Sequence, residues 1–486
     1  MVVVAILLAA VEVGRGISRM SSTRGKSILL LPIIAILPVV WQLIPPPRAI
    51  KVLSICLLLM PFKPYLPFGV LGIIPGMDEL GLWGLLMLGM ALVFLVKTAS
   101  RRISSPIAGW FWLAMFVFVL CGLVALLWVT DDGSVRLWYI VCMLSVITCY
   151  LTAMLVHNLE DAERLLSIIV GGMIVVGLVM CVFLGTHTFI LIEDPSSSSN
   201  WLSSVGRLGG SLAFLIPTVL GFSFKLQTSS NAPQLGEYVA MGLAISFTYM
   251  LGARSKRGRL MALVATLMLL IILFITQARG ALVATMIALA VISVISLGWP
   301  VFHRGHLVRL LSFILLVVPT AVLVVRWRID VDPTAGGYLN RIAALSSVAN
   351  IMNDPSLIGR MGLRQAAWEK IKLFPFGYGF SGAFTSGGYN NPHNLYLWLL
   401  QGSGWVGALS FMLALGGLGS LCLRGLNQPE PRRRVLSIAV LGVLIVVLVE
   451  GMGSVVFAVP QITAAFWAVM GVALVVNGRS HRSGIT

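Results

Sequence analysis

The chain has 486 residues, of which 58% are hydrophobic and only 10% are charged, and its mean hydropathy is +0.98. A soluble domain is about half apolar and about a quarter charged, so this composition excludes an ordinary soluble protein. The formal net charge of +17 comes from basic residues in short clusters between apolar runs. That pattern is typical of membrane topology and not of a nucleic-acid-binding patch.

Long apolar runs recur along the chain, each near the length of about 20 residues that a helix needs to cross a bilayer. The sequence therefore predicts an all-α polytopic membrane protein with about 12–14 transmembrane helices. Residues 1–12 lack the basic residues that precede a secretory signal, so we expect them to remain as a membrane segment. The other expected spans are 27–44, 50–75 (broken), 79–96, 106–129, 137–156, 165–192, 209–225, 237–252, 259–276, 281–299, 308–326, 394–423, 435–456 and 461–477.

Basic clusters such as 254–259 and 432–434 are expected in the cytoplasm. The alternation of spans then places the polar segment 192–207 and the long connection 327–392 in the periplasm, provided that 209–225 is re-entrant or broken. Apolar residues at helical spacing predict a short helix over 360–374 inside that connection. The predicted organisation is membrane helices in 1–190, helices with two arginine turns in 191–326, a large periplasmic loop in 327–392, and C-terminal helices with a cytoplasmic tail in 393–486.

His393 lies where a loop becomes an apolar helix. Asn391 suits the N-cap and Pro392 the first helical position, so His393 is expected in the first helical turn, with Tyr396 on the same face. The positive end of a helix disfavours imidazolium, and a neutral histidine can accept a proton as a general base. A histidine that is merely hydrogen-bonded at the membrane interface is an equally open interpretation.

Arg207 and Arg279 each lie beside a glycine at or near membrane depth, where an unpaired charge is costly. A guanidinium matches the geometry of phosphate oxygens, so both are candidates for binding an anion. The alternative is that they extend to the lipid headgroups. Glu450, an acid inside an apolar run, is a functional candidate by the same argument, or it balances an arginine.

The segment before His393 combines Arg360, Arg364 and Trp368 with the glycine-aromatic stretch 375–380. Flat aromatic faces can stack on sugar rings, although packing is the ordinary role of each aromatic taken singly. The sequence contains no Gly-rich phosphate-binding loop, no HExxH zinc motif and no soluble catalytic domain, so we expect neither a cofactor nor a metal.

Taken in order, these residues resemble the O-antigen ligase and O-antigen polymerase superfamily. The resemblance is strongest over 360–410, in Arg364 and Trp368, Pro375, Gly377 and Gly379, His393, Asn394, Tyr396 and Leu397, and Gly402 and Gly404. "QARGAL" around Arg279 is similar to the family's SRGAL, with Ala278 where serine is usual. "GRLGGS" around Arg207 resembles the upstream arginine turn, without the asparagine-proline-asparagine that often follows.

The resemblance implies a GT-C-like, metal-independent, inverting glycosyltransferase of the bacterial inner membrane, with its active site facing the periplasm. It would move a glycan from undecaprenyl diphosphate to a hydroxyl acceptor, which is the growing lipid-linked glycan for a polymerase and the lipid A core for a ligase. The expected partners are that donor, the acceptor and membrane lipids, and not nucleic acid. The implied catalytic residues are His393, Arg279 and Arg207, and the implied substrate-binding residues are Arg360, Arg364, Trp368, Asn394 and Tyr396.

Chain length and the extended N-terminal region favour a polymerase, and a protein-glycosylating member of the superfamily stays open. A flippase for lipid-linked glycans is the alternative from another functional class, because it would also need arginines for a diphosphate. Transporters of that kind carry polar residues along the whole path and often show internal repeats. We find no convincing repeat, and the polar residues gather on one side of the membrane, which favours an enzyme.

Overall fold

The computed structural model describes residues 106–128, 137–193, 232–253, 255–276, 278–297, 355–380 and 392–478, with the strands at 62–65 and 223–226 and residues 51, 53 and 57. The elements are β1 (Phe62–Tyr65), α6 (Pro106–Ala125), a 3-10 turn (Leu126–Trp128), a π-helical stretch (Tyr139–Leu144), α8 (Ser145–Leu155), α9 (Leu159–Glu193), β2 (Ser223–Leu226), α12 (Ala232–Gly252), α13 (Lys256–Thr276), α14 (Arg279–Leu297), α18 (Pro355–Leu373), α19 (Leu395–Leu426), α20 (Pro431–Glu450), a second 3-10 turn (Val456–Ala458) and α21 (Pro460–Gly478).

The all-α polytopic class predicted from composition is confirmed. Four described helices are long and apolar enough to cross a membrane, namely Lys256–Thr276, Arg279–Ser296, Leu395–Leu426 and Pro460–Gly478. A short antiparallel ribbon, in which Phe62 of β1 pairs with Leu226 of β2, has no counterpart among the expected elements. Several expected spans, including 27–44, 79–96 and 308–326, lie outside the described residues.

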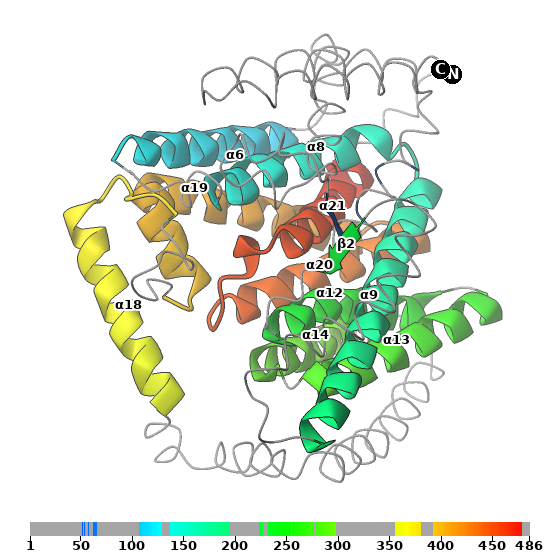
Figure 1. Ribbon diagram of the computed structural model, residues 1–486. Coiled ribbons are helices and arrows are strands. Elements are labelled where there is room, and N and C mark those ends of the chain that lie inside the picture. The colour runs from blue at the N-terminus through cyan, green and yellow to red at the C-terminus, as the bar shows by residue number, and fades with distance from the viewer. Residues whose placement is uncertain are drawn as a thin grey trace, which may run out of the picture.

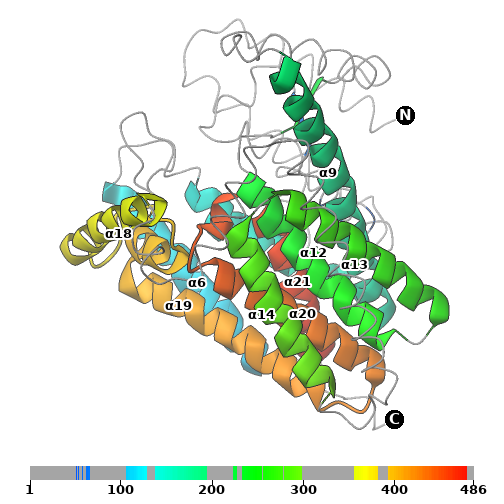
Figure 2. The ribbon, with the colours of Figure 1, turned by 90° about the horizontal axis from the view of Figure 1, so that it is seen from below.

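α19 packs against α6 and α21 (Figures 1 and 2), and an aromatic core holds the three helices together. Phe411 of α19 is fully buried, and its ring centroid lies 4.7 Å from that of Phe118 in α6 and 5.7 Å from that of Trp467 in α21. Phe457, in the turn before α21, packs on the same ring at 5.6 Å. Offset and edge-to-face contacts of this kind fix the mutual orientation of helices more closely than aliphatic contacts do.

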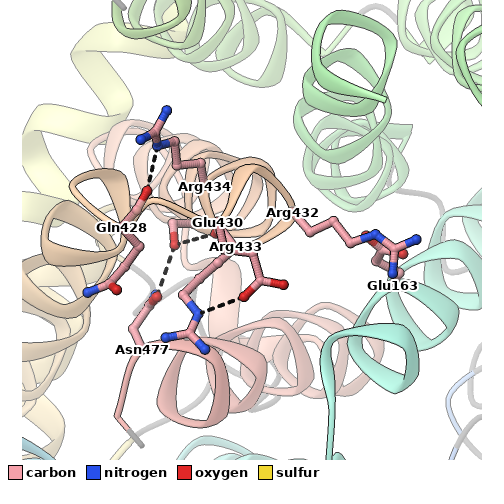
Figure 3. A network of polar contacts seen from close by, with 8 residues as sticks. Glu163, Gln428, Glu430, Arg432, Arg433, Arg434 and Asn477 are labelled. Carbon is pink, nitrogen blue, oxygen red and sulfur yellow. Dashed lines mark hydrogen bonds and ion pairs between the residues drawn. The ribbon is translucent and has the colours of Figure 1, made fainter. Parts of the chain in front are cut away.

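One end of the bundle carries the described basic clusters at 255–259 and 432–434, and we call it the basic end. Figure 3 shows that three consecutive arginines at the start of α20 reach separate neighbours. Arg432 approaches Glu163 of α9 at 4.0 Å, Arg433 approaches Glu430 at 3.8 Å, and Nε of Arg434 donates to the Gln428 carbonyl at 2.7 Å. These contacts connect α20 to α9 and to the α19–α20 connection. The basic residues therefore also help to hold the helices together.

The opposite end, which we call the outer end, is formed by the starts of α12, α14, α19 and α21 and the end of α20. The Ser454 hydroxyl, just after α20, donates to Oε1 of Glu237 in α12. Next to it, Gly236 leaves room for Ala278, which precedes α14; a Cβ on Gly236 would lie 2.3 Å from that of Ala278. α12 therefore runs from the outer end to the basic end and α13 returns, which places Glu237 and Arg279 at the same outer end.

α18 lies at this outer end and runs at a steep angle to α6 and α19 (Figure 1). Its bounds, Pro355–Leu373, include most of the short helix expected at 360–374. Ala367 and Ile371, one turn apart, are buried, whereas Met361 and Leu373 stay exposed. The helix therefore packs on the bundle with one face. This packing fixes the rotation of the helix about its axis and so the directions in which its polar side chains point.

Candidate active site at the outer end

The turn after α20 forms the base of the site. The span expected at 435–456 is too long at its C-terminal end, because α20 ends at Glu450 and the chain then turns back through Gly451 and Gly453. The Gly451 carbonyl accepts a hydrogen bond from the backbone N–H of Leu395 at 2.7 Å. The Met452 carbonyl accepts bonds from Nη2 of Arg364 at 2.8 Å and from Nδ2 of Asn394 at 3.2 Å. Backbone oxygens of one turn thus gather residues from α18 and from the start of α19.

The expected cap of α19 is wrong by several residues. Asn394 is the N-cap, because its Oδ1 accepts the N–H of Leu397 at 3.0 Å, and the helix begins at Leu395. His393 precedes the cap with φ of 45°, a left-handed conformation that is incompatible with the first helical turn. Non-glycine residues in that region cost about 1–3 kcal/mol and cluster at functional sites. The short Asn394 side chain makes the better cap, and His393 is left as a strained residue beside it.

Burial and two arginines favour the neutral form of His393. Its side chain is half-buried, and burial lowers the pKa of the imidazole below its ordinary value of 6.5. The positive charges of Arg360 and Arg364 lower this pKa further. The expectation of a neutral histidine thus agrees in direction, but its main causes are burial and nearby arginines and not membership of a helical turn.

Arg364 contacts the histidine loop directly. Its Nη2 donates to the His393 carbonyl at 3.4 Å as well as to Met452, so one guanidinium joins α18, the loop and the turn after α20. Nε of Arg364 is buried and has no hydrogen-bond partner among the described residues. This N–H could bind an anionic or hydroxyl-bearing ligand at the site.

Tyr396 and Trp368, two of the expected substrate-binding residues, each contact a neighbouring helix. The Tyr396 hydroxyl donates to the Leu448 carbonyl of α20 at 2.6 Å, so it connects α19 to α20. Trp368 lies one turn beyond Arg364 on α18, and its ring packs edge-on against Trp405 of α19, with centroids 6.1 Å apart. Both rings are substantially exposed, at 38% and 50%, and form an aromatic surface beside the site.

Arg279 is the first residue of α14 and is half-buried. The N–H of Leu282 donates to the Ala278 carbonyl at 2.9 Å, which starts the helix at the arginine. Glu450, at the end of α20, places its carboxylate against this first turn: a Cβ on Gly280 would lie 2.8 Å from Oε1. The acid singled out in the sequence therefore adjoins the arginine turn across two helices.

Gly404 lies at a break in α19, and the loop after α18 packs into this break. Gly404 interrupts that helix with φ of 68°, and a Cβ there would lie 2.5 Å from the Pro375 carbonyl. The N–H of Trp405 donates to this carbonyl at 3.0 Å, and the N–H of Tyr378 donates to that of Gln401 at 2.7 Å. A loop after α18 thus takes over backbone hydrogen bonds that the break leaves open, as buried polar groups require.

Phe380 and Gly402 complete this contact. A Cβ on Gly402 would meet the Phe380 ring at 2.2 Å, so only glycine lets the buried ring lie on the helix. Gly377 has φ of 98°, and a Cβ on it would similarly lie 2.7 Å from the backbone nitrogen of Gly404. The glycine spacing noted in the sequence is therefore explained by close backbone packing between the loop and α19.

With this geometry in view, residues 264–412 match the model of the O-antigen ligase family. The match confirms, over these residues, the resemblance to the O-antigen ligase and polymerase superfamily, and we call residues 264–412 the O-antigen ligase domain. This O-antigen ligase domain begins within α13 and ends within α19, so it includes Arg279, Arg364, His393 and the glycine contacts. The comparison with curated proteins gave no match to this chain.

The base of the site lies outside the O-antigen ligase domain. Leu448, Gly451 and Met452 contribute only carbonyl oxygens, which have no side-chain signature and could not be predicted from the sequence. The structure brings together Arg360, Arg364, His393 and Asn394, and Arg279 lies at the same end of the bundle, at the start of α14. Arg207 lies outside the described residues. In the described part, no group of three or more His, Cys, Asp or Glu side chains is arranged to hold a metal.

Proposed function

We propose that this protein is a membrane glycosyltransferase that moves a glycan from undecaprenyl diphosphate to a hydroxyl acceptor, as a polysaccharide polymerase or an O-antigen ligase. The domain match supports glycan transfer of the ligase or polymerase type. The observation that carries the proposal is the half-buried His393, whose pKa is lowered by burial and by Arg360 and Arg364 at the same end of the bundle as Arg279. A neutral base beside fixed cations suits attack of a hydroxyl on an anionic donor.

In the proposed reaction the acceptor oxygen forms a bond to the anomeric carbon of the donor glycan. The bond from that carbon to the diphosphate breaks on the opposite face, so the configuration inverts. His393 takes the hydroxyl proton, and undecaprenyl diphosphate leaves with the bonding electron pair. Arg279, and Arg207 where it joins the site, would stabilise the charge on the diphosphate, which is already a good leaving group and on this proposal needs no metal.

The periplasmic side of the inner membrane is the location that we propose for this chemistry. Among the described residues, the basic clusters at the starts of α13 and α20 lie at one end of the bundle, and the candidate site occupies the other. Positively charged segments favour the cytoplasm, so the outer end would face the periplasm. A polyprenyl diphosphate has its phosphates at the membrane surface, level with the outer ends of α14 and α19.

The experiment that tests the function uses the purified full chain in lipid nanodiscs with a synthetic undecaprenyl-diphosphate glycan and EDTA. Mass spectrometry follows the products with a lipid A core acceptor and, separately, with the donor alone. Longer glycans on the lipid would identify a polymerase, and a capped core would identify a ligase. His393→Ala should abolish either product, whereas His157→Ala, in the α8–α9 connection at the basic end, should not.

A flippase remains the competing function, because arginines for a diphosphate would serve it equally. The same lipid-linked glycan, reconstituted in sealed vesicles, would change leaflet in the presence of a flippase without any new glycosidic bond. Such movement would continue in His393→Ala. Transport without transfer would therefore contradict the proposed enzyme.

A further inference from the structure

We infer that Glu450 is a positioning residue for Arg279: its carboxylate rests on the first turn of α14 and holds that arginine where a lipid diphosphate can reach it. This inference rests on the proposed function, in which Arg279 binds the donor. Glu450 lies outside the O-antigen ligase domain, in the last turn of α20.

The contact is specific to the carboxylate. The three atoms nearest to the Cβ position of Gly280 are Oε1, Cδ and Oε2 of Glu450, at 2.8, 3.4 and 3.6 Å. Any side chain at residue 280 would therefore displace the carboxylate from α14. Glycine next to Arg279 has a steric reason here, namely the approach of an acid from another helix.

Electrostatics favours an acid in this place. The first N–H groups of a helix have no acceptor within the helix and carry partial positive charge. In α14 the hydrogen bond from Leu282 to Ala278 leaves the N–H groups of 279–281 without a helical acceptor. A carboxylate beside Gly280 stabilises this turn, and the turn sets the starting point of the Arg279 side chain.

The burial of Glu450 calls for an explanation beyond packing. Its side chain is only 6% exposed, and Oε2 has no hydrogen-bond partner among the described residues. Leaving a buried carboxylate oxygen without a partner is costly and is rarely tolerated without a purpose. The first turn of α14, whose N–H groups have no helical acceptor, is the neighbour that gains from a carboxyl oxygen.

The backbone of Glu450 links the arginine to the histidine. Its carbonyl accepts the N–H groups of Gly453 and Ser454, at 2.9 and 3.0 Å, and so shapes the turn whose Met452 carbonyl binds Arg364 and Asn394. One residue thus contacts the arginine turn through its side chain and supports the histidine loop through its main chain. Glu450 would thereby fix the position of Arg279, which binds the diphosphate, relative to His393, which accepts the proton.

The test measures donor affinity in Glu450→Gln and Gly280→Ala. Both variants should raise the KM for the lipid-diphosphate donor and weaken binding of farnesyl diphosphate by about tenfold or more, as small misplacements of a binding group do. The acid limb of the pH profile should stay unchanged, because His393 is not disturbed. In Gly280→Ala the new methyl group meets only the mobile end of Glu450, so this variant should fold even if Glu450→Gln does not.

Two comparisons separate positioning from a structural effect. Glu237→Gln removes the other buried acid of the outer end, whose carboxylate bonds Ser454, and should leave farnesyl diphosphate binding unchanged. The double variant Glu450→Gln with Gly280→Ala should bind no more weakly than the weaker single variant, because both remove one contact.

Wild-type binding in both single variants, with binding lost in Arg279→Gln, would overturn the positioning role and leave the proposed function standing. Wild-type transfer and binding in Arg279→Gln would overturn the role of Arg279 in the proposed function, and the inference with it. Equal loss of binding in Glu237→Gln and Glu450→Gln would indicate a general structural effect and would also overturn the inference.

Discussion

Arg364 and His393 are 29 residues apart in the chain, yet Nη2 of the arginine donates to the backbone carbonyl of the histidine at 3.4 Å. The same nitrogen bonds the Met452 carbonyl at 2.8 Å, so a single guanidinium fixes the loop that carries the candidate base. Its charge also contributes to the lowered pKa of that histidine. Arg364 therefore acts on His393 both through the main chain and through the electric field, and the two effects can be tested separately.

Replacing Arg364 by glutamine should lower the rate of glycan transfer by about 10- to 100-fold, because a hydrogen bond from a charged group contributes about 1.5–3 kcal/mol. Transfer would be measured with purified protein at saturating donor. Lys370→Gln, also on α18, is the matched control, because the Lys370 ammonium faces the Tyr378 ring, 5.5 Å from its centroid, and not the histidine loop. Equal rates in the two variants would contradict a specific role for Arg364.

Replacing His393 by asparagine should reduce transfer by about a hundredfold or more, the usual contribution of general-base catalysis. Asparagine tolerates the left-handed conformation with φ of 45°, so the loop should keep its shape. Thermal unfolding in detergent checks that the variant is folded. Activity near the wild-type level in a folded His393→Asn protein would exclude the histidine as the base.

The pH profile should reflect the lowered pKa of His393. Because the neutral imidazole is the active form, kcat/KM should rise with pH and level off, with a midpoint below 6.5. Arg360→Gln removes one of the charges that disfavour protonation, so the midpoint should move up toward 6.5. A midpoint above 6.5 in the wild type, or a downward shift in the variant, would contradict this assignment.

The lowered pKa of His393 also predicts that the folded protein is less stable at low pH. A histidine whose pKa is lower in the folded state takes up its proton more readily in the unfolded state. This contribution to folding free energy should be constant above pH 6.5 and decline as the pH falls through the folded-state value. Thermal unfolding of wild type and His393→Asn between pH 5 and pH 8, about the range where histidine titrates, would isolate it.

Gly404→Ala should destabilise the protein by at least about 1–3 kcal/mol, the cost of a non-glycine residue in left-handed backbone. A Cβ at this position also meets the Pro375 carbonyl at 2.5 Å, which adds to that cost. Gly416→Ala, on the same helix with open space around it, is the control and should be neutral or stabilising by about 0.5–1 kcal/mol. Chemical or thermal denaturation measures both; similar losses would contradict the packing argument.

Tyr396→Phe should cost about 0.5–1.5 kcal/mol of stability, because the Leu448 carbonyl loses its donor at 2.6 Å. Transfer should fall less than in the His393 and Arg364 variants, since the hydroxyl bonds to α20 and not to the imidazole. If transfer in a stable Tyr396→Phe protein falls as far as in His393→Asn, Tyr396 takes part in the reaction directly.

Membrane class and the positions of most described helices followed from the sequence alone. A bilayer demands apolar runs of fixed length, and the runs beginning near 106, 259, 281 and 461 match α6, α13, α14 and α21 within a few residues. The motif that carries His393 and Arg364 was also visible, because side-chain identity and order are properties of the chain itself.

Only the tertiary structure decided how those residues meet. The N-cap of α19 is Asn394 and not the expected Asn391. The capping hydrogen bond and the left-handed backbone of His393 depend on the turn after α20, which has no local sequence signal. The carbonyls of Leu448, Gly451 and Met452 are identical in chemistry to any others, so only their position distinguishes them. The same holds for Glu450, whose contact with Gly280 joins helices that are far apart in the chain. A sequence records which groups are present, whereas packing determines which of them are neighbours.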